Sequence, residues 1–408
     1  MLIMKIVIVG CGASGIACAI VAKRNGLDVT VLERNSSALK KLLITGNGRC
    51  NYFNDDFTIE HFYSSDMDVL DKIITFDNKE SILEFFSSVG IVPNVKNGYY
   101  YPYSNQASSI KETLLTEAIN LGVNFIYDAY VSSVIKSNNK FIIKCNDFEL
   151  ECDKVIISSG SCAYPKTGSD GNGYSLVSNL GHSVNDILPS LVPLAGEGSF
   201  LKRWEGVRCN SIVSLYADGK FIKKEEGEIQ LTSYGISGIC VFNISGLANK
   251  YLSLGKEVFV KINFVSFVSS SSDFIKWLDE RDNRLLDRTI SQHLDYILNY
   301  KLVNTVLSYL KIDGDSLWKD LDFESKKLLA ECLTSFNFTV LGSKSFDNSQ
   351  VCLGGVLLSE INPLTMESLI VPGLYLTGEL LDVCGDCGGY NLGFAFISGM
   401  IAGGSLND

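Results

Sequence analysis

The sequence predicts an α/β fold with a parallel sheet, and three observations near the N-terminus carry the prediction. Residues 5–9 form an apolar run typical of a buried strand. Gly10, Gly12 and Gly15 follow in a GxGxxG frame and lead into a helical stretch. A second apolar run then ends at Glu33. A strand, a tight turn, a helix and a second strand in this order form the Rossmann unit that binds an adenine dinucleotide.

Each residue of this unit has its own part in holding the dinucleotide. Gly10 lets the strand turn sharply, Gly12 lets backbone amides approach the pyrophosphate, and Gly15 lets the helix pack closely on the strand. The start of the helix then faces the phosphates with its partial positive charge. Glu33 comes 18 residues after Gly15, where its carboxylate can accept hydrogen bonds from a ribose hydroxyl. A 2′-phosphate would be repelled there, so NADP is a poor occupant.

The composition indicates a globular protein with a large core. The chain has 408 residues, 46% of them apolar, which allows two or three domains. We find no signal peptide and no apolar run as long as a membrane span, so we expect a cytoplasmic protein. The formal net charge is −11 and the basic residues are scattered, so nucleic acid is not expected as a partner. The 12 cysteines are expected to be reduced and mostly buried.

Changes of residue pattern along the chain predict a dinucleotide-binding domain built from both ends, residues 1–190 and 346–408. Residues 191–345 form an insertion, in which short strands with turns precede a polar helical stretch at about 270–333. The closing segment again has an apolar strand that enters a turn, followed by a helix rich in small residues. This organisation would bring the first glycine turn and the late turn together.

The strand LYLTGE at 374–379 ends in a second motif that bears on the cofactor. Gly378 ends the strand and Glu379 follows it, with Asp382 as an alternative carboxylate. In FAD-binding Rossmann proteins a carboxylate at this place binds the ribityl hydroxyls of the flavin, whereas NAD proteins need no such group, so the two motifs together favour FAD. The segment alone also fits a plain strand-to-helix turn. No second GxGxxG follows a strand, so NADH or NADPH would have to dock transiently.

Longer motifs carry a resemblance that runs from end to end of the chain. They are ITGNGRCN at 44–51, GSCAYPKTGSDGNGYSLVSNLGH at 160–182, SLVPL at 190–194 and the segment from TMESL to FISG at 365–399. With these motifs the chain resembles the bile-acid-reductase and aminoacetone-oxidase-like family of NAD(P)/FAD-dependent oxidoreductases. The resemblance implies an FAD-binding, Rossmann-like domain of the glutathione-reductase type, interrupted by an inserted β-barrel and a small helical domain.

The resemblance also implies where the cofactor is held. The ADP half would lie against the first glycine turn, the ribityl and pyrophosphate region against the late turn, and the isoalloxazine edge against the GGYN segment. The residues expected to bind the cofactor are Gly10, Gly12, Ala13, Ser14, Gly15, Glu33, Arg34, Gly46, Asn47, Gly48, Arg49, Val131, Gly160, Gly378, Glu379, Asp382, Gly388, Gly389, Tyr390 and Asn391. Amides of the paired glycines and of the helix after them would stabilise negative charge that develops on the flavin.

The sequence assigns no catalytic residue, and the candidates are Arg49, Tyr390 and Cys387. Arg49 is the only charged residue of its loop and could bind an anionic substrate, a phosphate or a neighbouring carboxylate. Cys384 and Cys387 form a CxxC that could relay electrons beside a flavin. A glycine turn that holds two thiols by chance is the simpler interpretation, and it is favoured here.

None of the three histidines, His61, His182 and His293, is expected to act as an acid or base, and His182 is expected to be structural or capping. No metal site is expected. Where the family tends to carry an arginine-containing segment before Phe-Pro, this chain has Tyr-Tyr-Tyr-Pro at 99–102, so substrate contacts there are expected to differ.

The main hypothesis is therefore a cytoplasmic FAD-dependent oxidoreductase that passes a hydride between flavin N5 and a small organic substrate held between the nucleotide and inserted domains. The resemblance allows reductases supplied by NADH or NADPH, and oxidases that return electrons to oxygen. The alternative is a flavin-binding redox sensor or scaffold without turnover, in which the CxxC or the insertion contacts a protein. The sequence leaves the substrate and the oligomeric state open.

Overall fold

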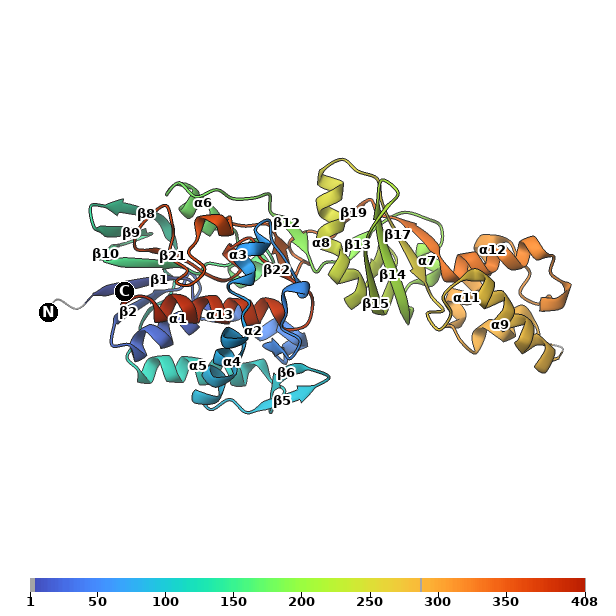
Figure 1. The fold of residues 1–408 in the computed structure, drawn as a ribbon, viewed down its shortest axis with the longest axis horizontal. Helices are drawn as coiled ribbons and strands as arrows, with labels where there is room; N and C mark the ends of the chain where they lie inside the picture. The colour runs from blue at the N-terminus through green and yellow to red at the C-terminus, as the bar shows by residue number, and fades with distance from the viewer. Residues whose placement is uncertain (1–3, 287, 408) are drawn as a thin grey trace. The chain divides into compact units, whose positions relative to one another are not determined.

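A computed structural model describes residues 4–286 and 288–407, which form two compact units (Figure 1). The first unit runs to Leu188 and resumes at Gln350, and the second covers Pro189–Ser349. Each unit has its own hydrophobic core. No helix in the described part of the chain is both long and apolar enough to cross a membrane.

A five-stranded parallel sheet forms the centre of the first unit. Its strands, in spatial order, are β21 (Leu374–Leu376), β11 (Lys154–Ile157), β1 (Lys5–Val9), β2 (Asp28–Leu32) and β7 (Asn124–Ile126). The strands are rich in Val, Ile and Leu and are largely buried, as expected for a parallel sheet covered by helices. The sheet confirms the predicted α/β class.

Helices α1 (Ala13–Arg24) and α13 (Tyr390–Gly404) pack against each other (Figure 1). Glycines make the close approach possible. A Cβ on Gly399 would overlap the Ser14 carbonyl oxygen, and a Cβ on Gly403 would stand 2.6 Å from the Cys18 carbonyl oxygen. This packing joins the two ends of the chain.

Smaller elements complete the first unit. Its antiparallel strands are β3 (Phe53–Asn54), β6 (Tyr99–Pro102) and β5 (Pro93–Lys96) in one sheet, β8 (Val131–Ser137), β9 (Lys140–Cys145) and β10 (Glu149–Cys152) in another, and the pair β4 (Phe62–Tyr63) and β22 (Cys384–Gly385). Its other helices are α2 (Lys40–Ile44), α3 (Met67–Asp71), α4 (Phe76–Ser88), α5 (Ala107–Asn120) and α6 (Asn172–Ser178). Strand β20 (Val351–Leu353) pairs with β12 (Leu188–Ser190).

The second unit is built on an antiparallel sheet that closes on itself. Its order is β18 (Phe336–Thr339), β17 (Val258–Asn263), β14 (Arg208–Ala217), β15 (Lys220–Thr232), β16 (Gly235–Ser237), β13 (Leu194–Ala195) and β19 (Gly342–Ser343). Strands β18 and β19 belong to one extended segment. Between them, the Val340 amide donates to the Val258 carbonyl and the Leu341 amide to the Ala195 carbonyl, each at 2.9 Å. One segment thus bonds to both ends of the sheet, which makes a barrel.

Helices accompany this barrel. Helix α8 (Ile239–Ser253) packs on its strands through a buried apolar side. The remaining helices of the unit are α7 (Leu201–Trp204), α9 (Ser271–Arg284), α10 (Ile290–Asp295), α11 (Tyr300–Leu310) and α12 (Phe323–Thr334). Thr289 begins α10 with a capping box, in which its side chain accepts from the Gln292 amide and the Gln292 side chain accepts from the Thr289 amide.

Candidate functional site

The glycine turn between β1 and α1 has the geometry of a pyrophosphate-binding turn. Gly10 has a φ of +99°, and its amide donates to the Leu32 carbonyl at 2.8 Å. A Cβ on Gly15 would overlap the Gly10 carbonyl oxygen, so this glycine lets the helix pack on the turn. A Cβ on Gly12 would meet no atom within 4 Å. The free side of Gly12 is thus a cradle that a side chain would fill, and it fits a dinucleotide phosphate.

Glu33 at the end of β2 is buried and holds the turn in shape. Its Oε2 accepts from the Cys11 amide at 3.0 Å, and its Oε1 accepts from the Asn35 amide and side chain, both at 2.8 Å. Each carboxylate oxygen has further acceptor capacity. Binding of a ribose hydroxyl by Glu33 therefore stays a prediction.

Two other expected cofactor residues are held by the loop that precedes α6. Arg34 forms an ion pair with Asp170, and its Nη1 donates to the Gly168 carbonyl at 3.2 Å. The Val131 carbonyl accepts from the Asn172 side chain at 2.8 Å. These contacts fix both residues beside the loop, and their part in cofactor binding stays a prediction.

The structure brings the late strand-end turn against the start of α1. A Cβ on Gly378, whose φ is +69°, would stand 2.6 Å from Ser14 Oγ. The Ser158 and Thr377 hydroxyls lie 2.8 Å apart under the turn. Gly160 follows at the end of β11 with a φ of +75°. Segments far apart in the sequence thus meet at the carboxyl ends of β1, β11 and β21, where ligands bind in open parallel sheets.

The two carboxylates of the late turn are both engaged by the protein. Glu379 Oε2 forms an ion pair with Lys41 Nζ at 2.6 Å, and Oε1 accepts from the Cys352 amide at 3.1 Å. Asp382 is buried, and its Oδ2 accepts from Ser65 and, at 2.8 Å, from the Asn185 side chain. The sequence gives no sign of the ion pair between Lys41 and Glu379, because the two residues are 338 positions apart in the chain. The ribityl role of either carboxylate stays a prediction.

The loop that follows α2 has a left-handed backbone over several residues. Gly46, Asn47 and Gly48 have φ values of +56°, +56° and +79°. The Cys50 amide closes the loop by donating to the Thr45 carbonyl at 3.0 Å. Glycine and asparagine are the residues that tolerate this conformation, which is why the loop can hold a fixed shape.

Arg49 is exposed at the tip of this loop. Its Nε donates to the Gly46 carbonyl at 3.2 Å, and its guanidinium carbon lies 5.0 Å from the centre of the Tyr101 ring. Within residues 4–286 and 288–407, no carboxylate lies within 4.0 Å of its nitrogens. A structural ion pair is therefore not found for Arg49 among these residues, and binding of an anionic substrate or a phosphate stays a prediction.

The GGYN segment opens α13. Gly389 has a φ of +96° and begins the helix without a side-chain cap. A Cβ on Gly389 would stand 2.6 Å from the Phe53 carbonyl and 3.0 Å from Asn51 Oδ1. Asn51 Oδ1 is buried and has no hydrogen-bond partner. An unpaired acceptor beside a helix N-terminus fits a polar group of a bound cofactor, and the sequence missed Asn51 although it ends the GNGRCN motif.

Asn391 and Asn54 hold the turn before α13. The Gly385 amide donates to Asn391 Oδ1 and Asn391 Nδ2 donates back to the Gly385 carbonyl, both at 2.8 Å. Asn54 Nδ2 donates to the Gly388 carbonyl at 2.9 Å. These contacts give Asn391 a structural part in the site.

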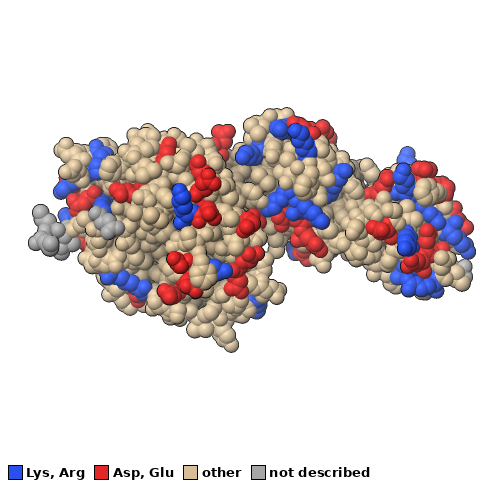
Figure 2. Space-filling view, in the orientation of Figure 1, with Lys and Arg blue, Asp and Glu red and all other residues tan. Residues whose placement is uncertain are grey.

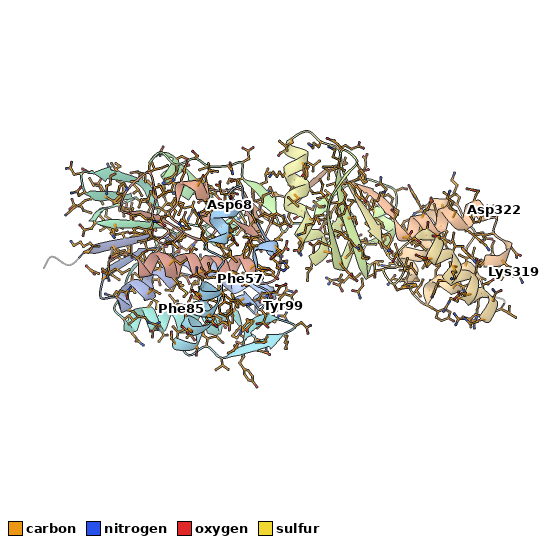
Figure 3. The ribbon with its side chains drawn as sticks, in the orientation of Figure 1. Phe57, Asp68, Phe85, Tyr99, Lys319 and Asp322 are labelled. Carbon is orange, nitrogen blue, oxygen red and sulfur yellow. The ribbon has the colours of Figure 1, made fainter. Side chains whose placement is uncertain are left out.

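Tyr390 is enclosed by aromatic rings. The His61 ring stacks on it with centroids 4.5 Å apart, and Phe57 and Phe62 lie 6.2 and 5.8 Å away. Figure 3 labels Phe57 in the first unit. This environment fits a packing role for Tyr390, and proton donation by its hydroxyl stays a prediction.

His61 lies between two carboxylates. Its Nε2 is 2.9 Å from Asp56 Oδ2 and its Nδ1 is 3.2 Å from Asp386 Oδ2. Burial lowers the pKa of His61, but the hydrogen bonds to Asp56 and Asp386 outweigh it, so the pKa is raised overall. The sequence missed this cluster.

The other two histidines lie elsewhere. His182 Nδ1 is 2.8 Å from Glu360 and Nε2 is 2.8 Å from Ser368, and burial lowers the pKa of this histidine, which fits a structural role. His293 is buried in the second unit, with Nε2 3.1 Å from Asp282.

The surroundings of Cys387 do not favour a reactive thiol in the CxxC. Cys384 and Cys387 are not joined by a disulfide. Burial, together with the charge of Asp386, raises the pKa of Cys387 to about 11. A reactive cysteine needs a lowered pKa, so the structural interpretation is supported.

Comparisons with known proteins agree with this architecture. A family model described as the HI0933-like protein Rossmann domain matches residues 4–405. The 3-dehydro-bile acid delta(4,6)-reductase of Clostridium scindens is 35% identical, over 98% of each chain. The ribosomal RNA dihydrouridine synthase of Escherichia coli is 27% identical, over 96% of this chain and 95% of the relative.

Two solved structures share the fold at low identity. A 3-ketosteroid-delta4-(5alpha)-dehydrogenase from Rhodococcus jostii matches with a TM-score of 0.50 at 14% identity, over 99% of this chain and 97% of the other. A flavocytochrome c3 fumarate reductase matches with a TM-score of 0.50 at 14% identity, over 98% of this chain and 77% of the other. The match over nearly the whole chain confirms the resemblance: the protein belongs to the HI0933-like Rossmann family of FAD-binding flavoproteins and is an FAD-dependent oxidoreductase.

Proposed function

We propose that this protein reduces a carbon–carbon double bond conjugated to a carbonyl in a small cyclic substrate. The names of the two relatives support the proposal. One names a delta(4,6)-reductase of a 3-dehydro compound, and the other a synthase of dihydrouridine. Both names imply addition of hydrogen across a ring double bond that is conjugated with a carbonyl group. Bound FAD supplies the hydride for such a reaction at its N5.

The observation that carries the proposal is the meeting of three segments in one unit. The Gly12 cradle and the turn at Gly378 follow strands β1 and β21 of the parallel sheet, and α13 packs against the turn at Gly378. The glycine turn would hold the ADP half of FAD, and the late turn would hold its central part. The first-turn amides and the dipole of α13 would stabilise negative charge placed against them, and the unpaired Asn51 Oδ1 would accept a hydrogen bond.

The electrons are proposed to come from NADH or NADPH, docked transiently. The hydride would add to the carbon remote from the carbonyl, and a proton from solvent or from the protein would add to the carbon beside it. A small molecule in the cytoplasm is proposed as the substrate rather than RNA, because the net charge is −11.

The first test is the visible spectrum of the purified protein and its anaerobic titration with NADH and with NADPH. We expect bound flavin and bleaching by one of the two donors. Reoxidation by a cyclic enone, such as 3-oxo-4-cholenoic acid, should then exceed reoxidation by oxygen. A protein that bleaches with neither donor, or that oxygen reoxidises faster than any enone, would not be a reductase of this kind.

The substrate class is tested in the same assay. Uridine-containing ribosomal RNA is offered in place of the enone, and dihydrouridine is measured by mass spectrometry. We expect no product with RNA. Dihydrouridine formation at a rate above that of enone reduction would replace the small-molecule proposal.

A further inference from the structure

Strand β6 presents two tyrosines on one face. Tyr99 and Tyr101 alternate with Tyr100, so they point to the same side of the small sheet. Tyr100 points to the other side, where its ring packs against Phe53 and its hydroxyl donates to Asp55 at 2.6 Å. The two faces of β6 therefore differ, with Tyr100 used for packing.

Each of the two tyrosines contacts a segment of the cofactor site. A Cβ on Gly388 would stand 2.8 Å from the Tyr99 ring, and one on Gly46 would stand 3.5 Å from the Tyr101 ring. Figure 3 labels Tyr99 in the first unit, where β6 lies. The shared face of β6 thus borders both the turn before α13 and the left-handed loop after α2.

Arg49 adds a positive charge to this face. Its guanidinium lies over the Tyr101 ring, and only its Nε–H has a hydrogen-bond partner in the described chain. The four N–H groups on its terminal nitrogens are free for a ligand. Stacking on the Tyr101 ring fixes the orientation of the Arg49 guanidinium plane. A planar guanidinium binds a carboxylate through two parallel hydrogen bonds.

We propose that Arg49, Tyr101 and Tyr99 form the recognition surface for a substrate that joins a flat unsaturated ring to a carboxylate. Tyr99, beside the turn before α13, would contact the ring, and Arg49 would bind the carboxylate. The two tyrosines are about 7 Å apart along the strand, so the ring and the carboxylate would be bound at separate places on this surface. The inference rests on the proposed function and names its substrate class.

A small carboxylate suits this surface better than a polyanion. Nucleic acid needs a row of cations, and in the described part of the chain β5 and the loop after α2 offer Lys96 and Arg49 beside β6. Acidic residues lie close by on the same unit, with Asp55 and Asp56 directly after β3. Figure 2 shows further acidic residues spread over the visible face of the first unit. These charges would repel a chain of phosphates.

The test compares 3-oxo-4-cholenoic acid with its methyl ester, in binding and in turnover. Binding to the FAD-loaded protein is measured by calorimetry and by the change in the flavin spectrum, and neither readout requires turnover. We expect the wild-type protein to bind the acid at least about tenfold more tightly than the ester. Arg49→Met should abolish this preference and raise KM for the acid about tenfold or more, and Arg49→Lys should restore part of the preference.

Two matched variants control for loss of positive charge. Arg24→Met removes an arginine at the far end of α1, which is paired with Glu117, and Lys96→Met removes the other cation near β6. Both should keep the preference for the acid. Loss of the preference in Lys96→Met but not in Arg49→Met would place the anion elsewhere and overturn the proposal, as would equal binding of acid and ester, or no binding of either, by the wild-type protein.

The aromatic part is tested at Tyr101. Tyr101→Phe keeps the ring under the guanidinium and should keep the preference, whereas Tyr101→Ala should weaken binding of the acid several-fold. Equal effects of the two variants would contradict the stacking. If the acid binds in an Arg49-dependent way but no enone is reduced, the recognition surface stands and the proposed reaction fails.

Discussion

A methyl group added at Gly12 and one added at Gly15 would meet different surroundings, although both residues belong to one turn. At Gly15 it would overlap the Gly10 carbonyl oxygen, whereas at Gly12 no atom lies within 4 Å. We expect Gly15→Ala to lower the free energy of unfolding by about 1–3 kcal/mol, as overpacking does. Gly12→Ala should leave the Tm of the flavin-free protein unchanged and weaken FAD binding by about tenfold or more, because the added carbon would occupy the cradle.

Thermal unfolding of flavin-free protein and titration with FAD separate the two effects. The two variants serve as controls for each other, since each adds the same methyl group to the same turn. A Gly12→Ala protein that loses stability as much as Gly15→Ala would show that the cradle is needed for folding instead of binding.

His61 makes the stability of the protein depend on pH. Its pKa is raised above the ordinary value of 6.5 by Asp56 and Asp386, against the lowering effect of burial. A histidine with a raised pKa stabilises the folded protein fully below pH 6.5, and this stabilisation is lost as the pH rises through the pKa of the folded state. His61→Gln should therefore lower Tm more at about pH 5.5 than at about pH 9. The side chain is 29% exposed, so solvent screening keeps the difference small.

The measurement is Tm of wild type and His61→Gln across this pH range. His182→Gln is the contrasting variant, because burial lowers the pKa of His182 and its protonation opposes folding at low pH. A Tm difference between wild type and His61→Gln that does not change with pH would mean that His61 contributes through ring stacking alone.

Some site residues could be predicted from the sequence and others could not. The difference lies in how far along the chain their contact partners are. The backbone of Gly10 or Gly46 is set by its own turn, so glycine spacing was enough to indicate these turns. The partner of Glu379 is Lys41, 338 residues away, and the partner of His61 is Asp386, 325 residues away. No local pattern encodes such pairs. They form only when the two ends of the chain fold into one unit.

Among the elements, the contact between α1 and α13 depends on single glycines. A Cβ on Gly399 would overlap the Ser14 carbonyl oxygen, whereas one on Gly404 would meet no atom within 4 Å. We expect Gly399→Ala to lower both Tm and FAD affinity, since it pushes α13 away from the start of α1. Gly404→Ala should leave FAD affinity unchanged and stabilise the helix by up to about 1 kcal/mol.

Differential scanning fluorimetry and FAD titration of the two alanine variants test this contact. Gly404→Ala is the matched control, because it adds the same methyl group to the same helix. Equal loss of Tm in both variants would point to an effect on the helix itself and not on the contact between helices.

Strands that contain a run of apolar residues are easier to predict from the sequence than very short strands are. The parallel strands β1 and β2 are short but fully apolar in their second halves, and they stand out in the sequence. Closure of the barrel does not stand out, because β13 and β19 have only two residues each. Two residues are too few to show the alternation that marks a strand. The closure follows instead from the bonds on both sides of the segment that joins β18 and β19.

At the scale of the whole molecule, the chain makes two cores that share no residue, one in each unit. The residues expected to hold FAD all belong to the first unit, which is interrupted at Leu188 and resumes at Gln350. The interruption begins and ends at neighbouring points, because β12 pairs with β20. The first unit therefore has a continuous core, and only a short connection would be needed between Leu188 and Gln350 if the second unit were removed.

We expect a chain in which a short Gly-Ser linker replaces Pro189–Ser349 to fold and to bind FAD. Its core stays complete, and a linker of a few residues can join Leu188 to Gln350 at small entropic cost, because the residues beside these two positions pair as β12 and β20. The flavin spectrum and cooperative thermal unfolding of this chain are the measurements. The matched control carries the same linker together with Gly12→Ala, which should fold equally well and bind FAD more weakly. A linker chain that unfolds cooperatively but binds no FAD would show that the second unit helps to hold the cofactor, and the proposed set of binding residues would then be incomplete.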